Sequence, residues 1–149
     1  MMLRVDVVVS SSPELLESLN QLVPQLSTSA TPLTSKQLDA LLRNEAVSLL
    51  IATEDGETVG TLTLAIFPLP SGIRAWIEDV IVDEHARGNG VGEALCLHAL
   101  EIARSRGVSR VDLTSRPSRE AANALYQKLG FETRDTNVYR RLIKEDELE

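Results

Sequence analysis

The feature that constrains this chain most is a run of glycines between an apolar, β-branched segment and a predicted helix. Residues 77–82 lead through a short turn into Arg87, Gly88, Asn89, Gly90, Val91 and Gly92. Glycine lets backbone N–H groups approach an anion closely, and a helix start has unpaired N–H donors at the positive end of its dipole. This strand–turn–helix order predicts a cradle for a phosphate group, with the charge of Arg87 at its rim.

Several interpretations of this glycine turn compete. A nucleotide-binding P-loop would need Gly-Lys-Ser/Thr after the glycines, which is absent here. A dinucleotide fingerprint would need a third glycine where Glu93 stands, although an acidic residue, Asp112, follows about 20 positions later. A meander-rich chain of this length also lacks the further βαβ units of a dinucleotide fold. The pyrophosphate of CoA is the third candidate ligand, and the structural alternative is a flexible turn that binds nothing.

A second group of residues lies downstream, on a helix predicted over residues 118–129. Asn123 and Tyr126 are three residues apart and therefore share one helix face, while Ala122 and Leu125 can pack on a sheet. Taken alone, Tyr126 is best interpreted as a packing aromatic whose hydroxyl finds a convenient acceptor. The glycine turn upstream reverses that preference, because the two groups together form a specific pattern.

This combination resembles the GNAT family of N-acetyltransferases over nearly the whole chain. Arg87, Gly90 and Gly92 match the defined positions of the family's Arg/Gln-x-x-Gly-x-Gly/Ala motif. The family's second signature is similar to the string Asn123-Ala124-Leu125-Tyr126-Gln127-Lys128-Leu129-Gly130-Phe131. The resemblance implies acetyl-CoA as co-substrate and direct transfer of its acetyl group to a primary amine. It also implies that residues 87–92 and Asn123 bind CoA, and that Tyr126 binds near the sulfur as general acid for the leaving thiolate.

The resemblance also gives a role to the strand before the glycine turn. In the family this strand separates from its neighbour at a bulge, and its freed backbone groups hold the acetyl carbonyl and the pantetheine arm. By position, that role falls on Val80, Ile81 and Val82. The apolar alternation over residues 73–77 is interrupted at Asp79 and continues with the other parity, as a bulge would produce. A strand buried on both faces would account for the pattern as well.

Two carboxylates on this strand are candidates for the general base. An amine is protonated in water and must lose a proton to attack a thioester. Glu78 is the first candidate to accept that proton, directly or through a water molecule, and Asp79 is the second. The family has no single invariant base, and either residue could instead form a salt bridge or orient the substrate. Family members with an Ile-Glu-Asp string here acetylate amino sugars, which is a hint about the acceptor.

Composition and charge exclude several other classes. The formal charge of −7 argues against nucleic acid as a partner and is compatible with a cationic substrate. No stretch approaches the roughly 20 apolar residues of a membrane span, and the N-terminus lacks the order of a signal peptide. A single cysteine fits a reducing compartment. These observations predict a cytoplasmic protein without a membrane partner.

The remaining cysteine and histidine side chains indicate no chemistry of their own. Cys96 falls on the apolar side of its predicted helix and is expected to be a buried, inert thiol. His85 is expected to be exposed in the turn, and His98 is expected at a boundary position on its helix. No His/Cys cluster has the spacing of metal ligands, so no metal is predicted.

The pattern of elements predicts one α/β domain over residues 1–149, with an acidic tail from about residue 144. The predicted order is β-α-α-β-β-β-α-β-α-β-β. Strands are expected over residues 3–9, 47–53, 58–67, 73–82, 108–114, 131–133 and 138–143. Helices are expected from Pro13, with Ser12 as its N-cap, to a stop at Pro24, after a capping box at Thr34, over residues 90–106 and over residues 118–129. The resemblance implies an α+β fold with a mixed, mainly antiparallel sheet of six to seven strands and about four helices.

The sequence leaves other functions and the acceptor open. A GNAT-like domain could bind acyl-CoA as a sensor or interaction module without catalysis, although the intact Tyr126 disfavours this. A nucleotide-binding module is a third hypothesis. The acceptor amine could belong to a small molecule, or else to a peptide or protein, because the connections over residues 25–33, 68–72 and 134–137 carry no motif. A homodimer is compatible with the resemblance, and the oligomeric state stays open.

Overall fold

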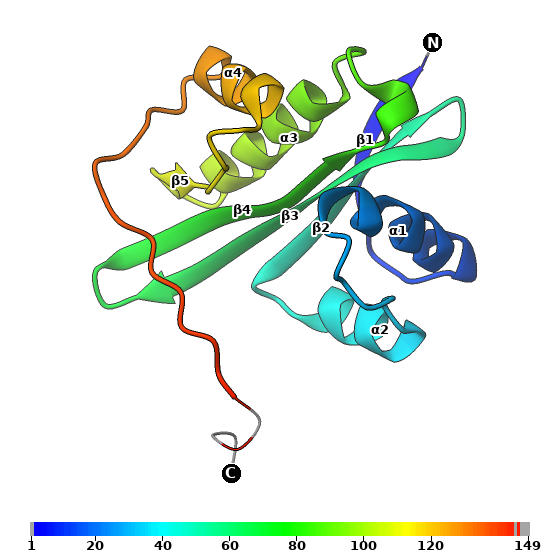
Figure 1. The fold of residues 1–149 in the computed structure, drawn as a ribbon, viewed down its shortest axis with the longest axis horizontal. Coiled ribbons are helices and arrows are strands. Elements are labelled where there is room, and N and C mark those ends of the chain that lie inside the picture. The colour runs from blue at the N-terminus through cyan, green and yellow to red at the C-terminus, as the bar shows by residue number, and fades with distance from the viewer. Residues whose placement is uncertain (1, 145, 147–149) are drawn as a thin grey trace.

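A computed structural model describes residues 2–144 and 146, which form one sheet between two layers of helices (Figure 1). The strands are β1 (Leu3–Val7), β2 (Val47–Glu54), β3 (Glu57–Leu69), β4 (Gly72–Val82) and β5 (Val111–Asp112). The helices are α1 (Pro13–Leu26), α2 (Ser35–Arg43), α3 (Val91–Ser105) and α4 (Glu120–Lys128), with a 3-10 turn at Glu84–Ala86. The strands lie in chain order across the sheet, and each is antiparallel to its neighbour except β5, which is parallel to β4.

Both faces of the sheet are covered. The larger core cluster lies under α3 and α4, where Leu50, Leu62 and Leu95 are completely buried. The smaller cluster lies under α1 and α2 and includes Leu38 and Leu49. Leu49 and Leu50 are neighbours on β2 and therefore point to opposite faces. Because helices cover both faces, β2 has apolar side chains at both its odd and its even positions, as expected for a strand that is buried on both sides.

The predicted fold class is confirmed, but the number of strands is wrong. Within the described residues the sheet has five strands rather than six or seven. Residues 131–133 and 138–143 form no strand, and the strand predicted over 108–114 is reduced to β5. A strand needs a neighbour for its backbone N–H and C=O groups. The chain after α4 leaves the sheet, so these residues have no neighbouring strand.

The predicted N-caps are confirmed, whereas the predicted end of the first helix is wrong. Ser12 accepts a hydrogen bond from the backbone of Leu15 at 3.1 Å, and the capping box at Thr34 is present. The expected stop at Pro24 is wrong, because α1 continues to Leu26. A proline in the last turn removes a single helical hydrogen bond, which the packing of α1 on the sheet outweighs. The predicted acidic tail over residues 144–149 lies mostly outside the described residues.

Cys96 lies in the core between α3 and the sheet, as predicted. Its side chain is fully buried, and burial raises the pKa of its thiol to about 11. The predicted burial of Cys96 is therefore confirmed. A thiol that stays protonated is a weak nucleophile, so its inertness stays a prediction that this burial supports. His98 on the same helix is exposed rather than at a boundary position.

None of the helices in the described part of the chain combines the length and the apolar character that a membrane span requires.

Strand β4 is distorted at Asp79. Thr61 of β3 pairs with Ile81 and Thr63 pairs with Glu78, so Asp79 and Val80 stand opposite a single residue of β3. Asp79 has a φ of 50°, in the left-handed region. This is the predicted β-bulge.

The bulge changes which side chains of β4 face α3. Ala75 and Ile77 before it, and Val80 and Val82 after it, all pack with the same core cluster although their parity differs. One extra residue in the strand accounts for that shift. The backbone conformation of Asp79 therefore holds the second half of β4 in the core.

Asp79→Gly is expected to raise the free energy of unfolding by about 0.5–1 kcal/mol. Glycine adopts the left-handed conformation without strain, and that gain exceeds its larger loss of chain entropy on folding. Chemical denaturation measures the change. The matched control is Glu78→Gly on the neighbouring residue, which has no positive φ and should lower the free energy by a similar amount. If both substitutions changed the free energy of unfolding in the same direction, the backbone of Asp79 would be unstrained.

The buried thiol of Cys96 predicts a pH-dependent contribution to stability. In the unfolded chain this thiol ionises near its ordinary pKa of 9.0, whereas in the folded protein it stays protonated to about 11. The unfolded state therefore loses the proton first, and stability falls as the pH rises through this window. The loss from this group is at most about 2.5 kcal/mol. The difference in unfolding free energy between the protein and its Cys96→Ala variant should narrow between pH 8.5 and 11, and a constant difference would contradict this account.

Candidate active site

The glycine turn is anchored at the end of β4. The Asp83 backbone N–H donates to the carbonyl of Val59 at 2.8 Å, and the buried Ala86 fixes the 3-10 turn that follows. Nε of Arg87 donates to the carbonyl of Val82 at 3.3 Å. Arg87 therefore lies against the strand that leads into the turn, while its side chain stays at the protein surface.

The glycines of this turn have separate roles. Gly88 and Gly90 have φ values of 85° and 80°, and no other atom lies within 4 Å of where a Cβ would be. Their backbone conformation therefore favours glycine, and the space around them is open. Gly90 is the N-cap of α3 and provides no side-chain acceptor for the first-turn N–H groups of that 15-residue helix. The turn thus presents backbone donors and a helix dipole to open space, as an anion site requires.

Gly92 acts instead through close packing. A Cβ on this residue would lie 3.1 Å from Cδ2 of Leu125, which belongs to α4. An ion pair between Lys128 of α4 and Glu93 of α3, at 3.0 Å, joins the same two helices. Glu93 is the position where a dinucleotide fingerprint would have its third glycine. Here it connects α3 to the helix that carries Tyr126.

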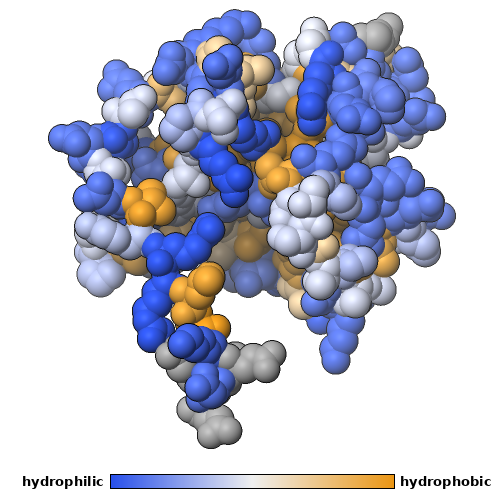
Figure 2. Space-filling model, viewed as in Figure 1, coloured by the Kyte–Doolittle hydropathy of each residue, from blue (hydrophilic) through white to orange (hydrophobic). Residues whose placement is uncertain are grey.

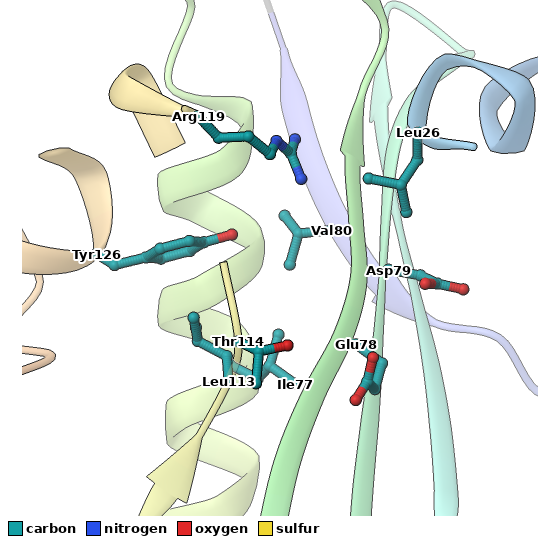
Figure 3. A pocket seen from close by; sticks show the side chains of 9 residues that line it. All are labelled: Leu26, Ile77, Glu78, Asp79, Val80, Leu113, Thr114, Arg119 and Tyr126. Carbon is teal, nitrogen blue, oxygen red and sulfur yellow. The ribbon is translucent and has the colours of Figure 1, made fainter. Parts of the chain in front are cut away.

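A pocket opens where β4 and β5 separate. Among the described residues, β5 pairs with β4 only at Ala75 and Trp76, so no described strand lies beside β4 on that side from Ile77 onward. The pocket has a volume of about 130 Å³. Its lining comes from β4, α4, the end of α1 and the segment after β5 (Figure 3): Leu26, Ile77, Glu78, Asp79, Val80, Leu113, Thr114, Arg119 and Tyr126.

Tyr126 is the titratable side chain on the α4 side of this pocket. It is buried, and its ring packs edge to face against that of Phe131, with 5.9 Å between the two ring centroids. Burial raises the pKa of the phenol, the Cys96 thiol raises it further, and Arg119 opposes the shift. The hydroxyl therefore stays protonated at neutral pH. Figure 3 shows it directed toward β4 beside Val80, where it can donate to a ligand bound along that strand.

Glu78 and Asp79 lie across β4 from Tyr126 in this view (Figure 3). Both are exposed, and Leu26 from the end of α1 lies close above Asp79 in the same view. The end of α1 is tied to the turn, because Gln25 accepts a hydrogen bond from the backbone of Glu84 at 3.0 Å. Two carboxylates and a protonated phenol therefore border one pocket.

The structure brings together only part of the predicted set. Glu78, Asp79, Val80 and Tyr126 line the pocket, whereas Ile81 is buried and does not line it. Val82 and residues 87–92 continue from the pocket along the end of β4. The side chain of Asn123 donates to the carbonyl of Arg116 at 2.9 Å and so holds the loop before α4. His85 is exposed, as expected.

Five lining residues were not among the predicted site residues: Leu26, Ile77, Leu113, Thr114 and Arg119. Of these, only Ile77 belongs to a string that the sequence pattern had singled out. The topology offers one signal, because ligands bind beyond the carboxyl ends of adjacent parallel strands, and Leu113 and Thr114 follow β5 directly. Among residues 2–144 and 146, no three His, Cys, Asp or Glu side chains gather as metal ligands would.

Comparisons with known proteins agree with this geometry. Glucosamine 6-phosphate N-acetyltransferase 1 of Oryza sativa subsp. japonica is 33% identical over 124 residues, which cover 76% of this chain and 70% of the rice protein. The glucosamine 6-phosphate N-acetyltransferase of Trypanosoma brucei brucei is 41% identical over 86 residues. That match covers 56% of each protein, so this chain spans little more than half of that relative.

Solved structures extend the similarity to the whole fold. A putative acetyltransferase from Agrobacterium tumefaciens superposes with a TM-score of 0.79 at 30% identity, over 95% of this chain and 100% of that one. A family model described as the acetyltransferase (GNAT) family matches residues 14–131, which include the glycine turn, the β4 bulge and Tyr126. The chain therefore belongs to the GNAT family of acetyltransferases.

Proposed function

We propose that this protein is an N-acetyltransferase that moves the acetyl group of acetyl-CoA directly to a primary amine of a small molecule. The observation that carries the proposal is the pocket at the β4 bulge. There the protonated Tyr126 and the carboxylates of Glu78 and Asp79 border one space. That space lies on the strand that runs into the glycine turn. Acid, base and anion site are thus arranged along a single strand.

The residues present fit acetyl-CoA as co-substrate. The glycine turn at residues 87–92 and the start of α3 would hold the pyrophosphate, with Arg87 beside it. The backbone of Val80, Ile81 and Val82 would hold the pantetheine arm along the open side of β4, with Asn123 as a further contact from α4. When bound, acetyl-CoA supplies a thioester whose carbonyl carbon is open to attack. The pocket's 130 Å³ suits an acetyl group and an amine nitrogen better than a whole acceptor.

The proton transfers follow from the two sides of the pocket. The amine arrives protonated, and Glu78 accepts that proton, directly or through water, with Asp79 as the alternative base. As the C–N bond forms and the C–S bond breaks, the nitrogen releases its second proton to solvent. Tyr126 donates its hydroxyl proton to the leaving sulfur and is reprotonated from solvent. The products are an amide, CoA as the free thiol and one net proton.

An amino sugar or a related small amine is the acceptor class that we favour. The rice and trypanosome relatives are both named for glucosamine 6-phosphate. The exposed carboxylates of Glu78 and Asp79 at the pocket would attract an ammonium group. Peptide or protein amines are the alternative acceptors. A panel of amino sugars, polyamines, amino acids and peptides, with thiol release as the readout, separates these classes.

Tyr126→Phe is expected to lower kcat by about 100-fold or more, because the leaving thiolate loses its proton donor. The affinity for acetyl-CoA, measured by calorimetry, should stay within about twofold, because the ring is kept. Tyr139→Phe is the matched control, since that ring is 88% exposed and outside the pocket. Full turnover in Tyr126→Phe would show that Tyr126 is not the general acid. Cofactor binding without turnover on any amine in the unsubstituted protein would favour a sensor instead.

Gly90→Ala is expected to weaken the binding of acetyl-CoA by about tenfold, because alanine disfavours the left-handed conformation that positions the turn. Binding of S-acetylpantetheine, which lacks the pyrophosphate, should be nearly unchanged. The control is Gly56→Ala in the β2–β3 hairpin, which has a φ of 86° and equally open surroundings but lies away from the turn. Equal weakening of both ligands would show that residues 87–92 do not hold the pyrophosphate.

A further inference from the structure

Arg119 is the basic side chain among the residues that line the pocket at the β4 bulge. Figure 3 shows its guanidinium group directed toward β4 beside Val80, above the hydroxyl of Tyr126. Glu78 and Asp79 lie on the other side of β4 in this view. The pocket therefore has a cation next to its phenol, and its two carboxylates lie opposite.

The charge of Arg119 is not neutralised by the protein. Hydrophilic side chains cover most of the molecular face in Figure 2, so exposure alone does not single out an arginine. Within residues 2–144 and 146, however, the guanidinium group of Arg119 forms no ion pair and no hydrogen bond. A guanidinium group has five N–H donors and keeps its charge at any physiological pH. Those donors are available to a ligand bound in the pocket.

An arginine is an unfavourable residue for this place in a helix. Arg119 is the N-cap of α4, and its side chain makes no capping hydrogen bond. The N-caps of α1 and α2 are Ser12 and Thr34, whose hydroxyls accept hydrogen bonds from the first turn. A cation at this end of a helix is also repelled by the positive end of the helix dipole. Residues that break such a local rule are expected where function requires them.

The backbone of Arg119 is nevertheless held firmly. Its N–H donates to the carbonyl of Arg116 at 3.0 Å, and its own carbonyl accepts from the N–H of Asn123 at 3.0 Å. The side chain of Asn123 donates to the same carbonyl of Arg116 at 2.9 Å. Tyr126 lies about two turns further along α4, so both side chains extend from one face of the helix. The start of α4 therefore fixes Arg119 and Tyr126 relative to each other.

The charge of Arg119 acts where Tyr126 would release its proton. Burial raises the pKa of the Tyr126 hydroxyl, the Cys96 thiol raises it further, and the charge of Arg119 lowers it. A positive charge beside a leaving group stabilises the negative charge that develops there. In the proposed transfer that negative charge develops on the sulfur of CoA, next to the hydroxyl of Tyr126.

We propose that Arg119 is a further catalytic residue, which stabilises the developing thiolate of CoA while Tyr126 supplies its proton. This inference rests on the proposed acetyl transfer. As the C–N bond forms and the C–S bond breaks, the electron pair of the C–S bond goes to sulfur, and sulfur takes the proton of Tyr126. Arg119 keeps all of its protons. A phosphate of CoA and an anionic group of the acceptor are the other anions that Arg119 could bind.

Three acetyl donors test the proposal in Arg119→Ser. The variant should lower kcat/KM about 10- to 100-fold with acetyl-CoA, and equally with S-acetylpantetheine, which lacks the phosphates. With the selenoester analogue of S-acetylpantetheine the loss should be about threefold at most, because a selenolate leaves more easily than a thiolate and needs less stabilisation. Arg116→Ser is the matched control. It removes the same charge from an exposed side chain of the same loop outside the pocket, and all three rates should stay within about twofold.

Two further measurements accompany these rates. The melting temperature of Arg119→Ser should not fall, because the variant loses a cation at the start of α4. Arg119→Lys, which keeps the charge, should recover most of the lost rate with the thioesters. The KM for the amine should stay the same in all variants.

Three results would overturn the proposal. A loss with acetyl-CoA alone would assign Arg119 to a phosphate, and a rise in the KM for the amine alone would assign it to the acceptor. Equal losses with the sulfur and selenium donors would show that Arg119 does not act on the leaving group. A protein without substitutions that turns over none of the donors would instead contradict the acetyl transfer itself.

Discussion

The left-handed residue in β4 is the constraint on which the rest of the site depends. The φ of 50° at Asp79 inserts one extra residue into the strand opposite β3. Without it, Val80 and Val82 would turn away from the core that Ala75 and Ile77 share with α3. The same irregularity lies where β4 loses β5 as its neighbour, so the strand keeps its packing while one side of its backbone opens. Strain of this kind is typical of a functional site.

The position of the glycine turn is then set by packing rather than by the turn itself. Gly60 on β3 lets α3 approach closely, because a Cβ there would lie 2.9 Å from Cγ1 of Val91 and 3.0 Å from the carbonyl oxygen of Ile81. Gly92 lets α4 approach the same end of α3. The contact at Gly60 positions the start of α3 over the end of β4. The contact at Gly92 positions α4, and with it Tyr126, at the pocket. One glycine on the sheet and one on the helix thus position the proposed anion site and the phenol relative to the same strand.

Local signals in the sequence predicted what is locally determined. The caps at Ser12 and Thr34, the glycine turn and the bulge at Asp79 each depend on a few adjacent residues, and the structure has all of them. The features that were predicted wrongly are determined by contacts with distant parts of the chain. Pro24 stays helical because α1 packs on the sheet, and residues 138–143 have strand composition but no neighbouring strand. Arg119 and Leu26 carry no motif and line the pocket only because α4 and α1 end there.

We infer that one strand aligns the proposed anion site, the open backbone and the acid. A crystal structure with acetyl-CoA bound should then show the pyrophosphate oxygens on the backbone N–H groups of residues 87–92. It should also show the acetyl carbonyl on the backbone of β4 just after Asp79, and the sulfur within hydrogen-bonding reach of the Tyr126 hydroxyl. A cofactor whose pyrophosphate lies away from the glycine turn, or whose sulfur lies beyond reach of Tyr126, would contradict it.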